Sequence, residues 1–283
     1  MTIKQLAIAN IDAIAELRKR NPDTNTLKSF RGSGIFKEAD FFLDHVKPKW
    51  LVEERERLTA LLTKAEFDSV FNTGLYNSHY TKQGIIDIIW GYLAKEVLAD
   101  RVNAKLKILD IGCGTGNFWW GKPKGLFPNS SYTGLDKCHL ATKLANAILV
   151  DDSNAAIKCN TIQKYLKIAQ IKDQTFDLVI GNFPFKAAGT RYINIGGKDI
   201  DVGLHGMCLH AAVKLLNPGG AIAAITSTSL LDAHGHAATK FRQWLDRKVD
   251  LVQAIRLPIN RIFYGKSVAP SDLVLFRKKC INS

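Results

Sequence analysis

The sequence predicts an α/β protein in which helices cover both faces of a mostly parallel, seven-stranded sheet, with a helical extension before it. From residue 105 onward, short apolar runs alternate with stretches of helical periodicity, a pattern typical of parallel sheets. The first of these runs leads directly into a glycine-rich turn, and sheets of this class bind ligands at such turns. Before residue 100, by contrast, the apolar residues recur at helical spacing.

The N-terminal part of the chain is expected to be helical, because its apolar residues fall on one face of each predicted helix. The predicted helices span residues 3–18, 52–73 and 82–99, with loops near residues 21–23 and 31–34. We therefore divide the chain into a helical extension over residues 1–75 and a catalytic domain over residues 76–283.

Seven apolar runs are short enough, and well enough separated, to be strands of one sheet. They are Leu106–Ile111, Ser131–Leu135, Ala155–Cys159, Phe176–Gly181, Ala221–Thr226, Leu251–Leu257 and Asp272–Arg277. Helices are expected between most of them, notably at His139–Val150 and at Leu204–Leu216, the latter ended by a turn at Asn217–Gly220. Because ligands bind at the carboxyl ends of parallel strands, the functional residues should follow the first four strands.

The charge of the chain is strongly basic. Lys and Arg number 39 against 26 Asp and Glu, which gives a formal net charge of +13. Such a surface attracts a polyanion and accelerates its encounter with the protein. A solvated basic surface without a partner is the alternative, so the charge supports a nucleic-acid partner only beside a site that needs one.

The cysteines and the apolar runs bear on the compartment. Five cysteines are scattered without the spacing of metal ligands, so we expect reduced thiols, no metal site and a cytoplasmic protein. No apolar run is long enough to cross a membrane, and the first residues lack the zones of a secretory signal.

A glycine-rich turn, Asp110–Gly116, follows the first predicted strand. Its glycines at 112, 114 and 116 allow a tight turn and a close approach of a ligand to the backbone. This spacing differs from that of dinucleotide-binding turns, and the Lys-Ser/Thr of a phosphate-binding loop is missing. Asp136, at the end of the second strand, can accept hydrogen bonds from ribose hydroxyls. Together these features predict a nucleoside cofactor that is bound without contacts to a phosphate group.

The fourth strand leads into Gly181–Phe185, whose residue types suit methylation of an aromatic amine. The Asn182 amide oxygen and the backbone carbonyl of Phe183 can accept both amine protons, which directs the nitrogen lone pair toward the methyl donor. Pro184 restricts the loop, and Phe185 offers a flat face for an extruded base. The alternative is a simple strand-ending turn, in which Asn, Gly and Pro are common.

Asp110–Gly116 resembles motif I of the Rossmann-type S-adenosylmethionine methyltransferases. The resemblance implies that Gly112, Gly114 and Gly116 pass under the methionine part and that Asp136 holds the ribose. It also places other residues in the cofactor site, namely Asp110, Lys137, Asn182 and Asn160, the last where the family often has a group that bonds adenine.

Two further segments resemble DNA adenine-N6 methyltransferases. Residues 182–185 resemble the N/D/S-P-P-Y/F signature, with Phe183 in place of the first proline, and residues 77–81 resemble motif X. In motif X, Tyr80 would supply an aromatic wall for the cofactor and the Thr81 hydroxyl would cap the next helix. The order of motifs X, I and IV is that of the gamma arrangement.

The resemblance extends over residues 28–279 to the methyltransferase half of helicase–methyltransferase fusions of phages and mobile elements. It rests on Ser29–Gly34, Trp50–Thr63, Asn77–Thr81, Asn182–Phe185, Leu216–Gly220, Ala254–Pro258 and Asp272–Phe276. Because little sequence follows the last strand, we expect no helicase and no target-recognition domain, and any sequence discrimination from short loops or another subunit. A homodimer and a specificity subunit are the two protein partners left open. Two surface segments are expected beside the active-site edge, a loop over Lys186–Lys198 and a turn over Arg261–Lys266. The candidate DNA-phosphate contacts in them are Lys186, Arg191, Arg261 and Lys266.

Three alternatives to a DNA substrate remain open from the sequence. RNA adenine methyltransferases and protein glutamine methyltransferases carry a similar tetrad, and the basic charge argues against only the protein substrate. The third alternative is a protection module of a mobile element that binds nucleic acid without turnover.

Overall fold

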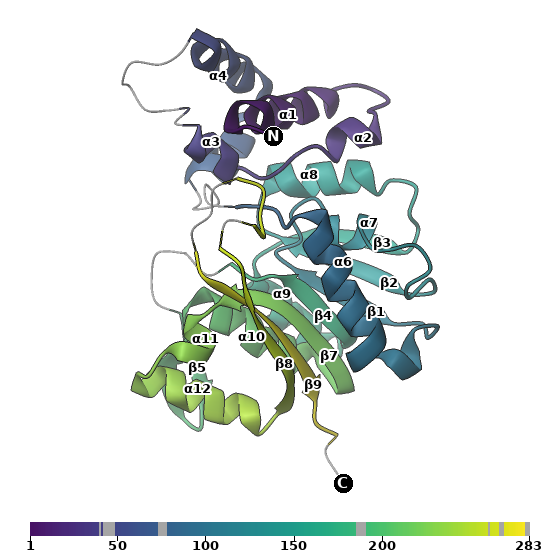
Figure 1. Cartoon of the computed structure of the whole chain (residues 1–283), viewed down its shortest axis with the longest axis vertical. Helices are drawn as coiled ribbons and strands as arrows, with labels where there is room; N and C mark the ends of the chain where they lie inside the picture. Colours follow the sequence, from purple (N-terminus) through teal and green to yellow (C-terminus); the bar gives the residue numbers. More distant parts are fainter. Residues whose placement is uncertain are drawn as a thin grey trace.

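The computed structural model describes residues 1–39, 41, 49–72, 78–184, 191–259, 261–265 and 269–280. Figure 1 shows a twisted sheet flanked by helices, with the N-terminal helices stacked at one end of it. The predicted boundary at residues 75 and 76 lies outside the described residues.

The central sheet has the predicted seven strands. They are β1 (Lys107–Ile111), β2 (Ser131–Asp136), β3 (Ala155–Cys159), β4 (Phe176–Asn182), β7 (Leu216–Ser227), β8 (Val249–Leu257) and β9 (Ser271–Lys278). Their order is β3-β2-β1-β4-β7-β9-β8, and only the two ladders of β9 are antiparallel. β2 and β3 follow β1 outward on one side, and β7 follows β4 on the other with β9 inserted before β8, so the order reverses between β1 and β4. That reversal is where ligands bind in open α/β sheets.

Helices cover both faces of the sheet at its central strands β1, β4 and β7, which explains why these strands are near-continuous apolar runs rather than alternating ones, whereas β3 and β8 are partly exposed. Leu109, Val179 and Ile222 face the helices α9 (Ile162–Ile171), α10 (Gly203–Leu215) and α12 (His236–Asp246). Ile108, Leu178 and Ala223 face α6 (Gln83–Tyr92) and α7 (Asn117–Trp120) on the opposite side. The helical path after α6 continues through η3 (Leu93–Val97) and η4 (Ala99–Arg101).

The N-terminal helices pack on α8 (His139–Ile148) through a third hydrophobic cluster. They are α1 (Ile3–Glu16), α2 (Thr24–Leu27), α3 (Gly34–Glu38), α4 (Lys49–Leu61), α5 (Lys64–Phe67) and η1 (Asp68–Asn72). The buried carboxylate of Glu66 also joins the two parts, since it accepts hydrogen bonds from Arg18 at 2.6 Å and from Lys143 of α8 at 3.0 Å.

Three predicted elements differ from the structure. The single helix expected over residues 52–73 is divided, because Thr63 begins a new helix by forming a capping box with Glu66. The loop expected over Lys186–Lys198 contains β5 (Tyr192–Ile195), which forms a hairpin with β6 (Lys198–Asp201) through Gly196 and Gly197 at φ 59° and 80°. The turn expected at Asn217–Gly220 lies inside β7, at a register shift against β4.

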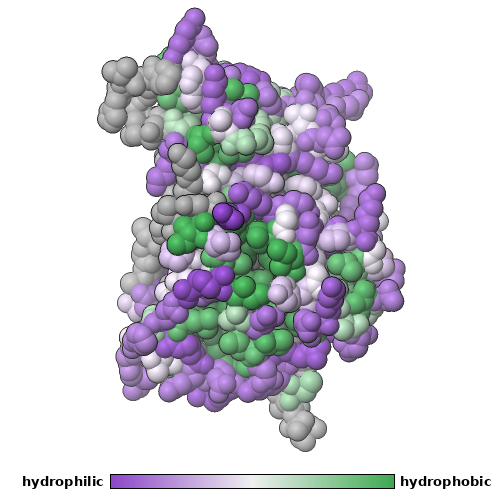
Figure 2. Space-filling view, in the orientation of Figure 1, coloured by the Kyte–Doolittle hydropathy of each residue, from purple (hydrophilic) through white to green (hydrophobic). Residues whose placement is uncertain are grey.

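The described surface is hydrophilic over most of the face in Figure 2, with hydrophobic residues gathered over the β8–β9 part of the sheet and its border with α6. Exposed Ile88, Leu251 and Val252 belong to these elements. In the ranges that the structure describes, no helix is both long and apolar enough to cross a bilayer.

Candidate active site

The turn after β1 has a conformation that only glycine adopts easily. Gly112, Gly114 and Gly116 have φ values of 77°, 56° and 78°, in the left-handed region. The backbone N–H groups of Gly112 and Cys113 donate to the carbonyl oxygen of Leu135 at 2.8 and 3.1 Å. These bonds to β2 hold the turn open at the carboxyl edge of the sheet.

Asp136 lies at the end of β2, directly beside this turn. Its two carboxylate oxygens accept the backbone N–H groups of Gly114 at 2.9 Å and of Cys138 at 2.8 Å. Burial raises the pKa of Asp136, and the two N–H donors oppose that shift. The Asn160 N–H donates to the Asp136 carbonyl, while the Asn160 side-chain oxygen accepts the N–H of Thr161. Lys137 is exposed at the same edge.

Asp110 is fully buried beneath the turn. One of its carboxylate oxygens accepts the hydroxyl of Tyr132 at 2.9 Å. The other oxygen, Oδ1, has no hydrogen-bond partner among the described residues. Burial raises the pKa of Asp110 to about 7, since a low-dielectric surrounding disfavours the charged form.

Residues 78–82 run beside the turn as an extended segment paired with residues 262–264. Lys82 donates its N–H to the carbonyl of Ile262, and Tyr264 donates to the carbonyl of Tyr80. The Tyr80 ring packs on Gly114 so closely that a Cβ atom added there would lie 2.8 Å from the ring. The predicted helix cap at Thr81 was wrong, because Lys82 occupies the N-cap of α6 and the buried Thr81 hydroxyl has no partner in the described part of the chain.

Asn182 ends β4 at the same edge and touches the glycine turn. A Cβ atom added at Gly112 would lie 3.5 Å from the Asn182 carbonyl oxygen and 3.7 Å from Pro184. The Asn182 side-chain Nδ2 donates to the backbone carbonyl of His79 at 3.2 Å, which sets the orientation of the amide. Its Oδ1 is buried and accepts no hydrogen bond from any described residue. The turn and the segment after β4 therefore open on one shared face.

Phe183 explains how the segment is held without the first proline of the signature. Its side chain is only 1% exposed and belongs to the main hydrophobic core. Its backbone N–H donates to Ile225 of β7 at 2.9 Å, a bond that a proline could not form. Burial and this hydrogen bond thus replace the restraint of a proline ring, while Pro184 is exposed.

The remaining predicted residues are only partly placed. Phe185, Lys186 and Lys266 lie outside the described residues, as does Asn77. Arg261 is exposed next to Ile262, beside the segment that carries Tyr80. Arg191 stands at the base of the β5–β6 hairpin, where its backbone N–H donates to Asp201.

Sequence analysis missed a cavity of about 290 Å³ beyond the carboxyl end of β7. Its lining includes His205, Ser229 and Phe241. Ser229 follows the end of β7, the strand whose Ile225 pairs with Asn182, but the lining includes no residue of the glycine turn or of Asn182–Pro184. No local motif marks these residues, because α10, α11 (Ser229–Asp232) and α12 bring them together only in the fold.

Unpartnered polar atoms are concentrated around the glycine turn. Of eight buried side-chain atoms without a partner in the described structure, four belong to Thr81, Asp110, Thr115 and Asn182. Buried polar groups are normally hydrogen-bonded, so such a cluster indicates a place that receives a polar ligand. Thr115 was not singled out from the sequence, although it lies within the turn. The cluster fits a nucleoside cofactor with hydroxyl, amine and carboxylate groups.

Residues 102–255, more than half of the chain, match a family model described as a methyltransferase domain. The chain belongs to this methyltransferase family. The methyltransferase has the Rossmann-like fold of S-adenosylmethionine-dependent enzymes, and S-adenosylmethionine is its cofactor. No curated protein sequence matches the chain.

Solved structures with a similar fold share little sequence with this methyltransferase. A putative class I S-adenosylmethionine-dependent methyltransferase from Listeria monocytogenes is 15% identical with a TM-score of 0.58, over 99% of this chain and 89% of that one. The methyltransferase subunit of a type I restriction-modification system from Streptococcus thermophilus is 14% identical with a TM-score of 0.59, over 95% and 65%. A modification subunit of a putative type I restriction enzyme from Vibrio vulnificus is 17% identical with a TM-score of 0.55, over 87% and 57%. This methyltransferase therefore spans less than two thirds of both restriction-system subunits.

Proposed function

We propose that this methyltransferase transfers the methyl group of S-adenosylmethionine to the exocyclic N6 amine of adenine in DNA. The observation that carries the proposal is the unpartnered amide oxygen of Asn182. The Asn182 Nδ2 donates to the backbone carbonyl of His79, which leaves the amide oxygen of Asn182 as a free acceptor. Gly112 of the glycine turn lies against Asn182. An acceptor placed beside a methyl donor suits a substrate that carries an N–H group.

The residues divide the work between cofactor and substrate. Gly112, Gly114 and Gly116 lie under the methionine part, Asp136 accepts hydrogen bonds from the ribose, and Asn160 lies toward the adenine of the cofactor. Bound S-adenosylmethionine supplies a methyl group on a positively charged sulfur. The open glycine backbone lets that group approach the segment after β4 closely.

Asn182 makes the target amine reactive. The lone pair of an aromatic amine is delocalised into its ring, and hydrogen bonds to Asn182 Oδ1 and to the Phe183 carbonyl localise it on nitrogen. Held in this way, the amine nitrogen would accept the methyl group that bound S-adenosylmethionine supplies and would then release a proton to water. No strong general base is needed, because the amine becomes acidic only after it has been methylated.

A base inside a duplex cannot reach this edge, so the adenine must be extruded from the stack. The cavity beside β7, with His205 and Ser229, offers room for the extruded nucleotide. Phe185 provides a stacking face. Sequence specificity is relaxed or comes from a partner subunit.

The charge favours a nucleic-acid substrate over a protein, and structural likeness favours DNA. The net charge of +13 attracts a polyanion. Two structures of similar fold are described as subunits of type I restriction systems, in which the modification subunit acts with others. Lys186, Arg191, Arg261 and Lys266 contact phosphates. Replacing all four with alanine should weaken DNA binding and flatten its salt dependence, and unchanged binding would refute that assignment.

The proposed reaction can be tested by incubating the purified protein with labelled S-adenosylmethionine and duplex DNA, structured RNA or a protein extract. We expect label in DNA, recovered as N6-methyladenine after digestion to nucleosides. Asn182→Ala should lower the rate by at least about a hundredfold while leaving S-adenosylhomocysteine binding intact. Asn146→Ala, at an exposed position of α8, is the matched control and should be fully active.

If the label appears in RNA or in protein glutamine, the assignment of DNA as the substrate is wrong, but the assignment of the site residues stands. Methylation that survives in Asn182→Ala would refute the role of the amide. A protein that binds cofactor and DNA but methylates none of the three substrates would support the non-catalytic alternative.

A further inference from the structure

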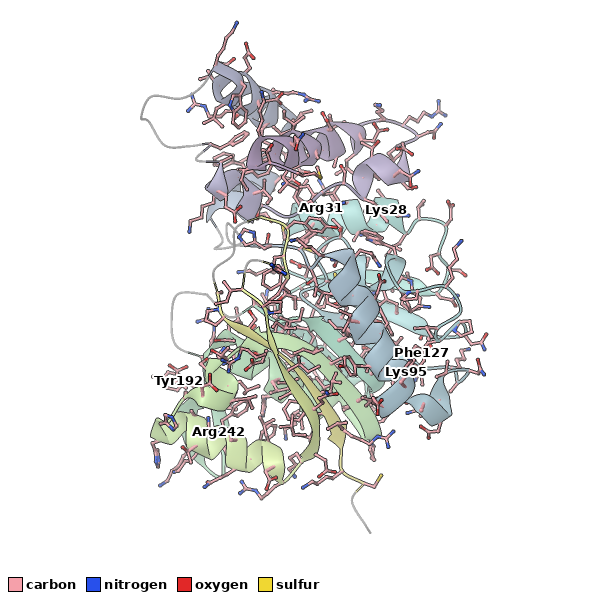
Figure 3. All side chains as sticks on the ribbon, in the orientation of Figure 1. Lys28, Arg31, Lys95, Phe127, Tyr192 and Arg242 are labelled. Atoms are coloured by element: carbon pink, nitrogen blue, oxygen red, sulfur yellow. The ribbon has the colours of Figure 1, made fainter. Side chains whose placement is uncertain are left out.

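A short segment of the N-terminal extension, Lys28–Gly32, packs against Tyr80 and Trp120, two residues that border the glycine turn; we call this segment the strap. At one end the Lys28 ammonium sits 5.6 Å from the ring of Trp120, which belongs to α7 directly after the turn. In the middle, Phe30 packs edge-on against Tyr80, with ring centroids 5.7 Å apart. Figure 3 shows Lys28 and Arg31 at the seam between the N-terminal helices and the rest of the molecule.

Arg31 is a half-buried cation on this strap. Its guanidinium carbon lies 4.4 Å from the centre of the Tyr264 ring, and Nη1 donates to the backbone carbonyls of Lys28 and Phe30. Its Nε is buried and has no hydrogen-bond partner in the described structure. Burial lowers the pKa of Arg31, but an arginine remains charged at neutral pH.

Arg31 also differs from comparable arginines in its charged neighbours among the described residues. Arg18 and Arg101, each about one third exposed, form ion pairs with Glu66 and Asp177 at 2.6 and 2.9 Å. Within the described ranges, no carboxylate forms an ion pair with Arg31. Removing a cation from water without an anion is costly, so such a group is expected where an anionic ligand compensates it.

The position of the strap indicates which anion that is. Asp136 and Asn182 lie at two sides of the turn. This step rests on the function proposed above, in which Asp136 takes the ribose and Asn182 lies beside the reacting methyl group. The third side is formed by Tyr80, whose ring stands between Gly114 and Phe30 of the strap. The part of the cofactor not yet assigned is its methionine end, which would lie on the Tyr80 side of the turn. The carboxylate of this end is the anionic group of the cofactor. A guanidinium fork matches a carboxylate in shape and can bind both of its oxygens.

We propose that Arg31 binds the carboxylate of the methionine part of S-adenosylmethionine, so that the N-terminal extension completes the cofactor site. This inference concerns cofactor binding alone and does not depend on the identity of the methylated substrate.

Calorimetry with two ligands tests the proposal without any activity assay. S-adenosylhomocysteine carries the carboxylate, and S-adenosyl-3-thiopropylamine is the same molecule without it. Arg31→Gln should weaken binding of the first by about ten- to a hundredfold, as expected for a lost charge-assisted pair, and of the second by less than about twofold. Arg31→Lys should recover part of the loss. Lys4→Gln removes a cation of the N-terminal extension that lies over Trp50, away from the strap, so it is the matched control and should change neither affinity.

The proposal is overturned if Arg31→Gln weakens both ligands equally, because the arginine would then only support the fold. It is also overturned if neither affinity changes. Thermal unfolding of each variant without ligand separates loss of fold from loss of the carboxylate contact.

Discussion

Replacing Asp110 by asparagine should make the stability of the folded protein less dependent on pH. The carboxyl group is fully buried, and burial raises its pKa from 3.8 to about 7. Because the folded-state pKa lies above the unfolded value, the folded protein keeps a proton that the unfolded chain has released. The stabilising effect of that proton is complete below about pH 4 and is lost as the pH rises toward 7.

The size of the effect follows from the shift. A shift of about three pKa units corresponds to roughly 4 kcal/mol across the full range, at about 1.4 kcal/mol per unit. Between about pH 5.5 and about pH 8.5, the contribution of Asp110 to the free energy of unfolding changes only up to its folded-state pKa near 7, because above that pH both states have lost the proton. Asp110 should therefore lower the free energy of unfolding by about 2 kcal/mol over this interval.

Urea denaturation of the parent and of Asp110→Asn at these two pH values measures the difference. The variant keeps the shape of the side chain and an oxygen for the Tyr132 hydroxyl, so it should lack this part of the pH dependence. Asp151→Asn, at an exposed position, should behave like the parent. An identical pH dependence in the parent and in Asp110→Asn would refute the reasoning.

Other consequences can be measured with single substitutions. Gly114→Ala should weaken S-adenosylhomocysteine binding at least about tenfold, since its Cβ would lie 2.8 Å from the Tyr80 ring at a φ of 56°; normal affinity by calorimetry would mean that the ring moves aside freely. Phe183→Pro restores the usual signature but removes the bond to Ile225 and a buried ring, so it should lower the free energy of unfolding by about 3 kcal/mol or more. Raised methylation by that variant would contradict this account. Glu66→Gln breaks a buried ionic cluster and should cost about 3–5 kcal/mol at neutral pH. The pKa of Glu66 is lowered to about 2, so its carboxylate stabilises the fold fully above about pH 4.5. The difference in free energy of unfolding between the parent and Glu66→Gln should therefore shrink as the pH falls toward about 2. If this difference does not change with pH, the carboxylate is not its source.

The central strands of the sheet were predictable because helices cover both of their faces and each is a near-continuous apolar run. Ala155–Cys159 has its predicted bounds, and the other strands differ by a few residues at their ends. The β5–β6 hairpin was missed although Tyr192–Ile195 alternates before two glycines, because its position in the chain favoured a loop. The break at Thr63 was missed because the apolar stripe continues across the capping box.

The sequence by itself determined the local features of the site, namely the glycine spacing at 112–116, the acid at 136 and the residue types at 182–184. These depend on backbone conformation and on chemistry within a few residues, which a sequence records directly. Only the tertiary structure decided which polar atoms lack a partner. The Asn182 amide is oriented by His79, 103 residues away, and Arg31 meets Tyr264 from the opposite end of the chain. Hydrogen bonds and counterions of this kind depend on distances between remote segments, and those distances exist only once the chain has folded.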